Sequence, residues 1–314
     1  MTHAPLLVVG SDVTEDELTA FRAIADVHYV HNELGYEAMT DAARAAVTAL
    51  SAKGHGALGG DVMDLFPNLK VIANFGVGYD QIDVAAADAR GIKVTNTPDV
   101  LNDEVADLTV AMMLAVARKI VDGDAWVRSG TWATGQALPL NRKMSGATVG
   151  IVGLGRIGAV IAKRLEGFDM DIHYHSRSPK PVSYTYHADL VEMAKAVDWL
   201  VIALVGGDET KGYVTREVID ALGPDGVIVN ISRGTTIDEG AMLDALEQGR
   251  IAGAGLDVFL NEPRIDARFM ALEQVVLQPH QGSATVQTRK AMGDLQRANI
   301  AAHFAGAPLV TPVN

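Results

Sequence analysis

A glycine pattern near the middle of the chain restricts the fold more than any other feature. Gly153, Gly155 and Gly158 have the spacing G-x-G-x-x-G, after the apolar run TVGIV at 148–152 and at the start of a helix-like segment, 156–166. The first glycine permits a tight turn, the second lets the backbone approach a pyrophosphate, and the third lets helix and strand pack closely. We predict that this helix N-terminus binds dinucleotide phosphates, through Gly153, Leu154, Gly155, Arg156, Ile157 and Gly158. The alternative is a strand-to-helix turn that binds no ligand.

Short β-branched runs alternate with longer helix-like segments on both sides of this motif, which is typical of parallel α/β architecture. Before the motif, strands are expected at 6–10, 27–30, 56–59, 71–75 and 93–96. From the motif onward, strands are expected at 148–152, 171–175, 199–204, 227–231, 254–258 and 275–279. A length of 314 residues favours two domains at about 150 residues each. We predict two doubly wound parallel-sheet domains, with the chain crossing between them twice.

Composition and charge exclude several classes of protein. Hydrophobic residues make up 48% of the chain, so each domain can bury a full core and the chain is not intrinsically disordered. The sequence has no cysteine, which excludes disulfides and thiolate chemistry, and we assign no metal. A net charge of −13 argues against nucleic acid or an anionic membrane as the main partner. The N-terminus lacks the features of a signal peptide, and we expect a cytoplasmic location.

The end of the second strand after the glycine motif favours NADP(H) over NAD(H). An acidic residue about 20 positions beyond the motif would bind the adenosine ribose 2′-hydroxyl of NAD. In this chain the strand 171–175 is followed instead by Ser176, Arg177 and Ser178. A carboxylate would repel a 2′-phosphate, whereas a guanidinium and two hydroxyls would bind it. The alternative is that Arg177 is a solvated surface residue.

Three later strands lead into ionisable side chains that do not belong in a core. Arg233 follows the strand 227–231, Asp257 and Glu262 come at and after the end of 254–258, and His280 follows 275–279. Ligands of open parallel sheets bind at the carboxyl ends of the strands, where all of these should lie. Each alone has a plain structural explanation, as a surface arginine, a solvated glutamate or a structural histidine. Together they favour one reaction centre.

The chemistry of the three side chains fits a single reaction. An arginine fork can bind a carboxylate through two hydrogen bonds and polarise an adjacent carbonyl. A histidine can deliver a proton to that carbonyl oxygen as hydride reaches the carbon. A glutamate bonded to the other ring nitrogen would orient the imidazole and favour its charged form. This pattern predicts reduction of a carbonyl that lies next to a carboxylate.

The chain resembles the D-isomer-specific 2-hydroxyacid dehydrogenases, within their glyoxylate/hydroxypyruvate reductase branch. The similarity runs from about Asn74 to Thr285 and includes NFGVGYDQID, NTPDVLNDEVAD, GIVGLGRIG, NISRGTTIDEGAMLDAL, AGLDVFLNEP and PHQGSAT. The resemblance implies a Rossmann-type coenzyme domain, residues 99–287, inserted into a flavodoxin-like substrate domain, residues 1–98 and 288–314. It also implies a homodimer formed through the coenzyme domain, with 103–118 and 122–146 as the contacts.

The resemblance also assigns roles to individual residues. It implies a catalytic trio of Arg233, Glu262 and His280, with His280 as the acid/base. It implies that the backbone N–H groups of Val77 and Gly78 bind the substrate carboxylate together with Arg233. Further cofactor contacts are implied for Val205, Thr210, Ile231, Ser232, Asp257, Gly282 and Ser283, with Asp257 holding the nicotinamide carboxamide.

The leading hypothesis is NADPH-dependent reduction of small 2-oxoacids, glyoxylate and hydroxypyruvate, to D-2-hydroxy acids. One alternative is a reductase of larger 2-oxoacids of the phenylpyruvate type, and another is phosphoglycerate dehydrogenase, which often carries an extra C-terminal regulatory domain. A non-enzymatic alternative is a nucleotide-sensing binding module of the corepressor type. Turnover separates these classes, because a binding module should hold the cofactor and reduce these acids slowly or not at all.

Overall fold

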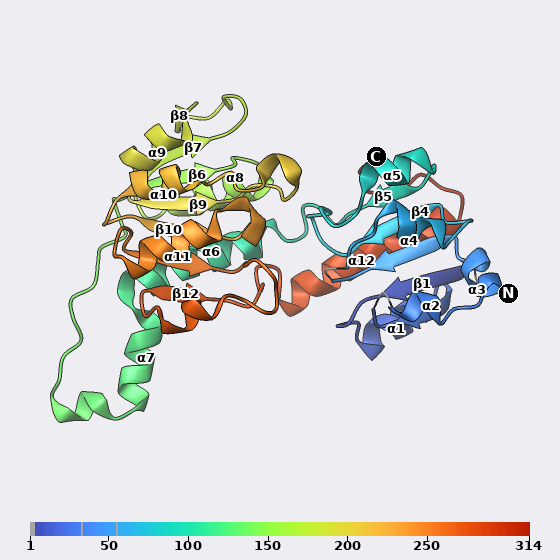
Figure 1. Ribbon diagram of the computed structural model, residues 1–314, viewed down its shortest axis with the longest axis horizontal. Coiled ribbons are helices and arrows are strands. Elements are labelled where there is room, and N and C mark those ends of the chain that lie inside the picture. The colour runs from blue at the N-terminus through green and yellow to red at the C-terminus, as the bar shows by residue number, and fades with distance from the viewer. Residues whose placement is uncertain (1–3, 33, 55) are drawn as a thin grey trace. The chain divides into compact units, whose positions relative to one another are not determined.

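A computed structural model of the protein describes residues 4–32, 34–54 and 56–314. The chain forms two compact units (Figure 1). The terminal unit comprises residues 1–101 and 285–314, and the inserted unit comprises residues 102–284. The chain therefore leaves the terminal unit once, completes the inserted unit and returns. That the inserted unit binds the coenzyme and the terminal unit binds the substrate remains a prediction.

The terminal unit is built on a five-stranded parallel sheet with the order β2-β1-β3-β4-β5. This is the flavodoxin-like strand order, so the fold class predicted for this unit is confirmed. Its strands are β1 (Pro5–Val9), β2 (Asp26–Val30), β3 (Ala49–Ala52), β4 (Val71–Asn74) and β5 (Lys93–Thr95). Its helices are α1 (Glu15–Arg22), α2 (Leu34–Glu37), α3 (Asp41–Ala46), α4 (Gly60–Asp64), α5 (Val84–Ala89) and α12 (Val286–Phe304).

Alternating residues of the central strands fill two separate cores in the terminal unit. Leu6 and Val8 pack with Phe21 of α1 and Ile300 of α12 on one face of the sheet. Leu7 lies in the other core, which also contains residues of α4 and α5. This is the arrangement expected for a parallel sheet that is covered by helices on both faces.

The strand predicted at 56–59 is wrong. The third strand is β3, which pairs with β1 and β4 through residues 49–52. Leu58 makes only an isolated bridge to Ile82, and α4 begins at Gly60. The sequence ALSA of β3 is largely buried but contains no β-branched residue, so it lacks the composition that predicts a strand.

The inserted unit is built on a seven-stranded parallel sheet with the order β12-β11-β10-β9-β6-β7-β8. Six of these strands have the Rossmann order and β12 extends the sheet at one edge, which confirms the predicted fold class. The strands are β6 (Thr148–Val152), β7 (Asp171–His175), β8 (Thr185–His187), β9 (Trp199–Ile202), β10 (Val227–Asn230), β11 (Gly253–Leu256) and β12 (Val275–Leu277). The α-helices are α6 (Asn102–Arg118), α7 (Ile120–Arg128), α8 (Arg156–Glu166), α9 (Leu190–Ala196), α10 (Arg216–Leu222) and α11 (Glu239–Glu247).

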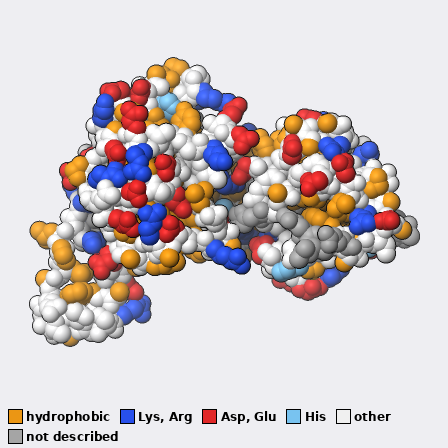
Figure 2. All heavy atoms as spheres, viewed as in Figure 1, with side chains coloured by type: hydrophobic (Ala, Val, Ile, Leu, Met, Phe, Trp, Pro, Cys, Tyr) orange, Lys and Arg blue, Asp and Glu red, His pale blue; other side chains and the backbone are white. Residues whose placement is uncertain are grey.

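The segment between α6 and β6 extends away from the sheet of the inserted unit as an arm, residues 120–146 (Figure 1). It contains α7 and a single 3₁₀ turn, Thr131–Thr134. Hydrophobic side chains lie on its surface (Figure 2), including Trp132, which is 68% exposed, and Leu140, which is fully exposed. Large exposed apolar side chains that lie together on one segment are often found at protein–protein contacts.

Candidate functional site

The turn from β6 into α8 has the geometry that a dinucleotide phosphate requires. Gly153 has a positive φ of 98°, and a Cβ there would lie 2.7 Å from the carbonyl oxygen of Ala203. A Cβ on Gly158 would overlap the carbonyl of Gly153, so helix and strand approach too closely for any side chain. Gly155 is the N-cap of α8 without a side-chain cap, and a Cβ there would meet open space. The helix N-terminus is therefore accessible to an anion, and the residues present fit the predicted cofactor.

The turn after β7 places the three residues predicted to select the cofactor. The Ser176 hydroxyl donates to the carbonyl of Ser178 at 2.6 Å, and the carbonyl of Ser176 accepts from Tyr186 at 3.3 Å. The N–H of Lys180 donates to the Tyr174 hydroxyl at 2.7 Å. These bonds fix the backbone of a turn from which Arg177 extends into solvent.

Further predicted cofactor contacts lie in the loops after β9 and β10, at the same edge of the sheet. The Thr210 hydroxyl donates to the carbonyl of Val205 at 2.6 Å, and the Ser232 hydroxyl donates to the carbonyl of Leu204 at 2.5 Å. Val205 is 63% exposed, whereas Ile231 and Ser232 are buried. The loops are therefore held by their own side-chain hydrogen bonds.

The structure brings His280 and Glu262 into direct contact. Nδ1 of His280 lies 2.7 Å from Oε2 of Glu262. The other carboxylate oxygen of Glu262 accepts the N–H of Phe259 at 2.8 Å, which fixes its orientation. Arg233 follows β10 and donates to the carbonyl of Ser232 at 2.9 Å. Because β10, β11 and β12 are neighbours, the three predicted catalytic residues follow adjacent strands at one edge of the sheet.

Asp257 is buried beneath the loop that carries His280. Its two carboxylate oxygens accept the N–H groups of Gln281 at 2.6 Å and Gly282 at 2.8 Å. Its own carbonyl accepts the N–H of His280 at 2.9 Å. Burial raises the pKa of the Asp257 carboxyl, and the two N–H donors oppose that rise. Asp257 thus holds the turn 280–282, which also precedes the predicted contact Ser283.

Two residues that the sequence reading missed support the loop that carries Glu262. A Cβ on Gly234 would overlap the backbone of Phe259 and Leu260. Glu239 is 6% exposed, and its carboxylate accepts the N–H of Leu260 at 2.8 Å. Burial raises the pKa of Glu239. Nothing in the sequence marks Glu239, because an acidic residue in the first turn of a helix is ordinary.

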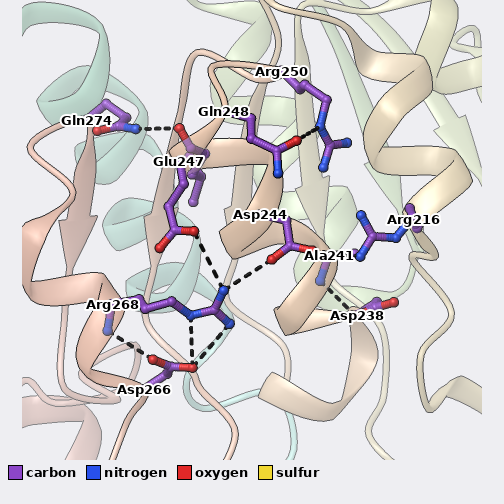
Figure 3. Close-up of polar contacts among 11 residues, drawn as sticks. Arg216, Asp238, Ala241, Asp244, Glu247, Gln248, Arg250, Asp266, Arg268 and Gln274 are labelled. Carbon is purple, nitrogen blue, oxygen red and sulfur yellow. Dashed lines mark hydrogen bonds and ion pairs between the residues drawn. The ribbon is translucent and has the colours of Figure 1, made fainter.

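An ion-pair cluster ties the segment after Glu262 to α11 (Figure 3). The Arg268 guanidinium contacts Asp244 at 3.1 Å, Asp266 at 3.3 Å and Glu247 at 3.8 Å. Asp266 also accepts the backbone N–H of Arg268 at 2.9 Å. These bonds from Arg268 hold the pKa of Asp266 below its usual range. The cluster lies on the surface and serves to anchor the segment rather than to carry chemistry.

The predicted substrate loop follows β4 in the terminal unit. Val77 and Gly78 are half-buried there, and their carbonyls accept hydrogen bonds from asparagine side chains. The family resemblance pointed to the N–H groups of this loop, and the role of the asparagines was not predicted.

The described residues contain no group of three His, Asp or Glu side chains that could hold a metal ion. Over the same residues, no helix is both long and apolar enough to cross a membrane.

Comparisons with known proteins show which family the chain resembles. Residues 110–282 match the D-isomer specific 2-hydroxyacid dehydrogenase, NAD binding domain. The chain is 50% identical over 254 residues to hydroxyphenylpyruvate reductase from Plectranthus scutellarioides, covering 81% of each protein. It is 49% identical over 248 residues to glyoxylate/hydroxypyruvate reductase A from Arabidopsis thaliana, covering 79% of each.

Among solved structures, the chain is similar to NADPH-dependent glyoxylate/hydroxypyruvate reductase from Sinorhizobium meliloti in complex with NADP and malonate. The sequence identity is 42% and the TM-score is 0.94, over 99% of this chain and 97% of that one.

Proposed function

Because the chain belongs to the D-isomer-specific 2-hydroxyacid dehydrogenase family of oxidoreductases, we propose that it reduces glyoxylate to glycolate and hydroxypyruvate to D-glycerate with NADPH. The observation that carries this proposal is the contact of 2.7 Å between His280 Nδ1 and Glu262. A carboxylate at one ring nitrogen orients the imidazole so that the other nitrogen can serve as the proton donor of a general acid.

The three catalytic residues have different tasks in the proposed reaction. When bound, the reduced nicotinamide supplies a hydride to the substrate carbon. His280 protonates the carbonyl oxygen, and Glu262 stabilises the imidazolium before that transfer. Arg233 binds the substrate carboxylate and polarises the adjacent carbonyl. The family resemblance also implies that the N–H groups of Val77 and Gly78 bind a substrate carboxylate without adding charge.

We assign cofactor binding and the catalytic trio to the inserted unit, and further substrate contacts, at Val77 and Gly78, to the terminal unit. The glycine turn 153–158 would hold the pyrophosphate, and Ser176, Arg177 and Ser178 would bind the 2′-phosphate of NADP(H). The exposed Arg177 and the absence of a carboxylate at 176–178 support the preference for NADP(H). The Sinorhizobium meliloti reductase is NADPH-dependent, which supports the same preference. The remaining cofactor contacts would be Val205, Thr210, Ile231, Ser232, Asp257, Gly282 and Ser283.

A larger 2-oxoacid is the second candidate substrate. The relative from Plectranthus scutellarioides is a hydroxyphenylpyruvate reductase and is as similar to this chain as the glyoxylate/hydroxypyruvate reductase from Arabidopsis thaliana. An aromatic 2-oxoacid has the same carboxylate and carbonyl, so the His280–Glu262 pair would serve both reactions.

We further propose that the protein is a homodimer formed through the inserted unit. The exposed apolar side chains of the arm, Trp132 and Leu140 among them, support this assembly. The lack of cysteine fits a reducing compartment, and we propose the cytoplasm.

Steady-state oxidation of NADPH and NADH tests the proposed function. Glyoxylate, hydroxypyruvate, pyruvate and hydroxyphenylpyruvate are compared as substrates for the wild type, Arg177→Ala and Arg216→Ala. Arg216 serves as the matched control because it pairs with Asp244 elsewhere in the inserted unit. We expect NADPH-linked reduction of the two small acids, and a loss of about tenfold or more in NADPH preference only for Arg177→Ala. Faster turnover of hydroxyphenylpyruvate would favour the second candidate, and tight cofactor binding without turnover would rule out both.

A further inference from the structure

Three consecutive carbonyls in the loop after β4 are bound by side-chain amides. Nδ2 of Asn74 donates to the carbonyl oxygens of Gly76 at 3.1 Å and Gly78 at 2.9 Å. The Gly76 carbonyl also accepts the backbone N–H of Thr97 at 2.9 Å. Nδ2 of Asn96 donates to the carbonyl oxygen of Val77 at 2.9 Å. Since all three partners are acceptors, only the NH₂ end of each amide can face them. Asn74 therefore uses both of its amide hydrogens on this one loop.

Fixing a carbonyl also fixes the N–H group of the same peptide. In a trans peptide the C=O and N–H bonds point in opposite directions. The carbonyl of Gly76 shares its peptide with the N–H of Val77, and the carbonyl of Val77 shares its peptide with the N–H of Gly78. Within the described part of the chain, neither of these N–H groups donates to a backbone carbonyl. Asn74 and Asn96 thus turn two adjacent donors away from the protein.

The two asparagines are themselves held by the sheet and by the C-terminal segment. Asn74 ends β4, and Asn96 directly follows β5, which pairs with β4. The carbonyl of Asn96 accepts the Thr311 hydroxyl at 2.6 Å. Thr311 in turn accepts from the fully buried Asn299 of α12 at 2.9 Å. The backbone of Asn96 is therefore held by the C-terminal segment as well as by its position directly after β5.

We propose that Asn74 and Asn96 are positioning residues for the substrate carboxylate, which set the direction of the Val77 and Gly78 N–H groups. This inference rests on the proposed function of the loop. Two adjacent N–H groups form an anion-binding concavity without a positive side chain. The amides act through the backbone and do not touch the substrate, so their loss should weaken carboxylate binding without changing cofactor affinity.

Alanine variants at the two asparagines test this role. Asn74→Ala and Asn96→Ala are compared with Asn68→Ala, whose exposed amide donates to the carbonyl of Ala45 at 2.7 Å in the same unit. With saturating NADPH, we expect KM for glyoxylate to rise about tenfold for Asn96→Ala, less for Asn74→Ala because the N–H of Thr97 still holds the Gly76 carbonyl, and not for the control. The Kd of NADPH should change less than twofold in all three variants.

A neutral substrate separates positioning from a general structural effect. Methyl glyoxylate has the same carbonyl without the carboxylate, so its kcat/KM should fall less than that of glyoxylate in the asparagine variants. Equal losses for both substrates, or an unchanged KM for glyoxylate in folded variants, would overturn the proposal. If an alanine variant does not fold, Asn74→Ser and Asn96→Ser, which keep a hydroxyl donor on a shorter side chain, take its place.

Oxalate binding distinguishes failure of this inference from failure of the proposed function. Calorimetric titration of the NADPH complex with oxalate requires no turnover. If the wild type reduces no 2-oxoacid, the proposed function fails, and the oxalate titration still decides the role of the asparagines. Weaker oxalate binding in Asn74→Ala and Asn96→Ala supports the role, and equal affinities would overturn it.

Discussion

The two units use different chemistry at the carboxyl ends of their parallel sheets. The loop after β4 offers neutral backbone N–H groups, which Asn74 and Asn96 orient through carbonyls. The edge after β10 to β12 offers charged side chains, and Glu262 and His280 contact each other directly. Under the proposed function, binding an anion and moving a proton impose different demands on the same type of sheet edge.

The difference follows from what each region must do. A carboxylate can be bound by fixed N–H dipoles, which need no titratable group and lose no charge when pH changes. Proton transfer requires a side chain that changes its protonation state, and such a side chain needs a partner to stabilise its charge. In a protein with a net charge of −13, neutral donors also bind an anion without requiring further cations in that loop.

The largest effect is expected from removing the proton donor. His280→Gln keeps a side chain of similar size but cannot act as an acid, so kcat should fall by about 10²–10⁴-fold. Oxalate affinity should change little, because the N–H groups of Val77 and Gly78 are untouched. His28→Gln, at an exposed position of the terminal unit, is the control. A fall in kcat of less than tenfold for His280→Gln would remove His280 from the role of acid.

A smaller effect is expected from crowding the support beneath Glu262. Gly234→Ala introduces a Cβ that overlaps the backbone of Phe259 and Leu260, and the free energy of unfolding should fall by about 1–3 kcal/mol. Gly240→Ala is the matched control, because a Cβ there lies 3.6 Å from a single oxygen of Asp238 in the first turn of α11. That control should be neutral or stabilising by up to about 1 kcal/mol. Denaturant titration measures both, and equal stability of the two variants would contradict the close contact at Gly234.

The smallest expected effect is a pH dependence of stability at the edge strand β8, which pairs with β7. Burial, and then the charges of His173 and His175, lower the pKa of His187, whose Nε2 lies 2.8 Å from Nδ1 of His173. The unfolded chain therefore binds more protons than the folded one below the usual pKa of 6.5, and stability should fall as pH falls through that value.

The expected change is small because solvent partly screens these histidines. Between pH 8 and pH 5.5, Tm should fall by about 1–2 °C more in the wild type than in His187→Gln. Calorimetry at both pH values measures the difference. An identical pH dependence in the two proteins would show that His187 does not contribute.

The sequence predicted the elements that have strong apolar patterns. The strands at 148–152 and 171–175 and the helix at 156–166 match the structure residue for residue. The strand β3 was missed because its sequence, ALSA, contains no β-branched residue. The strand β8 was missed because its three residues, TYH, lie at the edge of the sheet without a buried apolar run. Local pattern therefore predicts an element only where burial selects large side chains.

Side chains at the candidate site were predictable where they carry charge and follow a strand. His280 and Glu262 were placed together from their positions alone, and the structure brings them into contact. Asn74, Asn96 and Glu239 act through backbone groups that are distant in sequence or hidden in a turn. No spacing rule identifies such contacts, because they depend on the path of the loop rather than on its composition.

The configuration of the product formed from hydroxypyruvate is the most direct test of the proposed reaction. The purified protein is incubated with NADPH and hydroxypyruvate, and the product is analysed by chiral chromatography alongside His280→Gln. Formation of D-glycerate in step with NADPH oxidation, lost in His280→Gln, is the predicted result. L-glycerate, or NADPH binding without any product, would contradict the account.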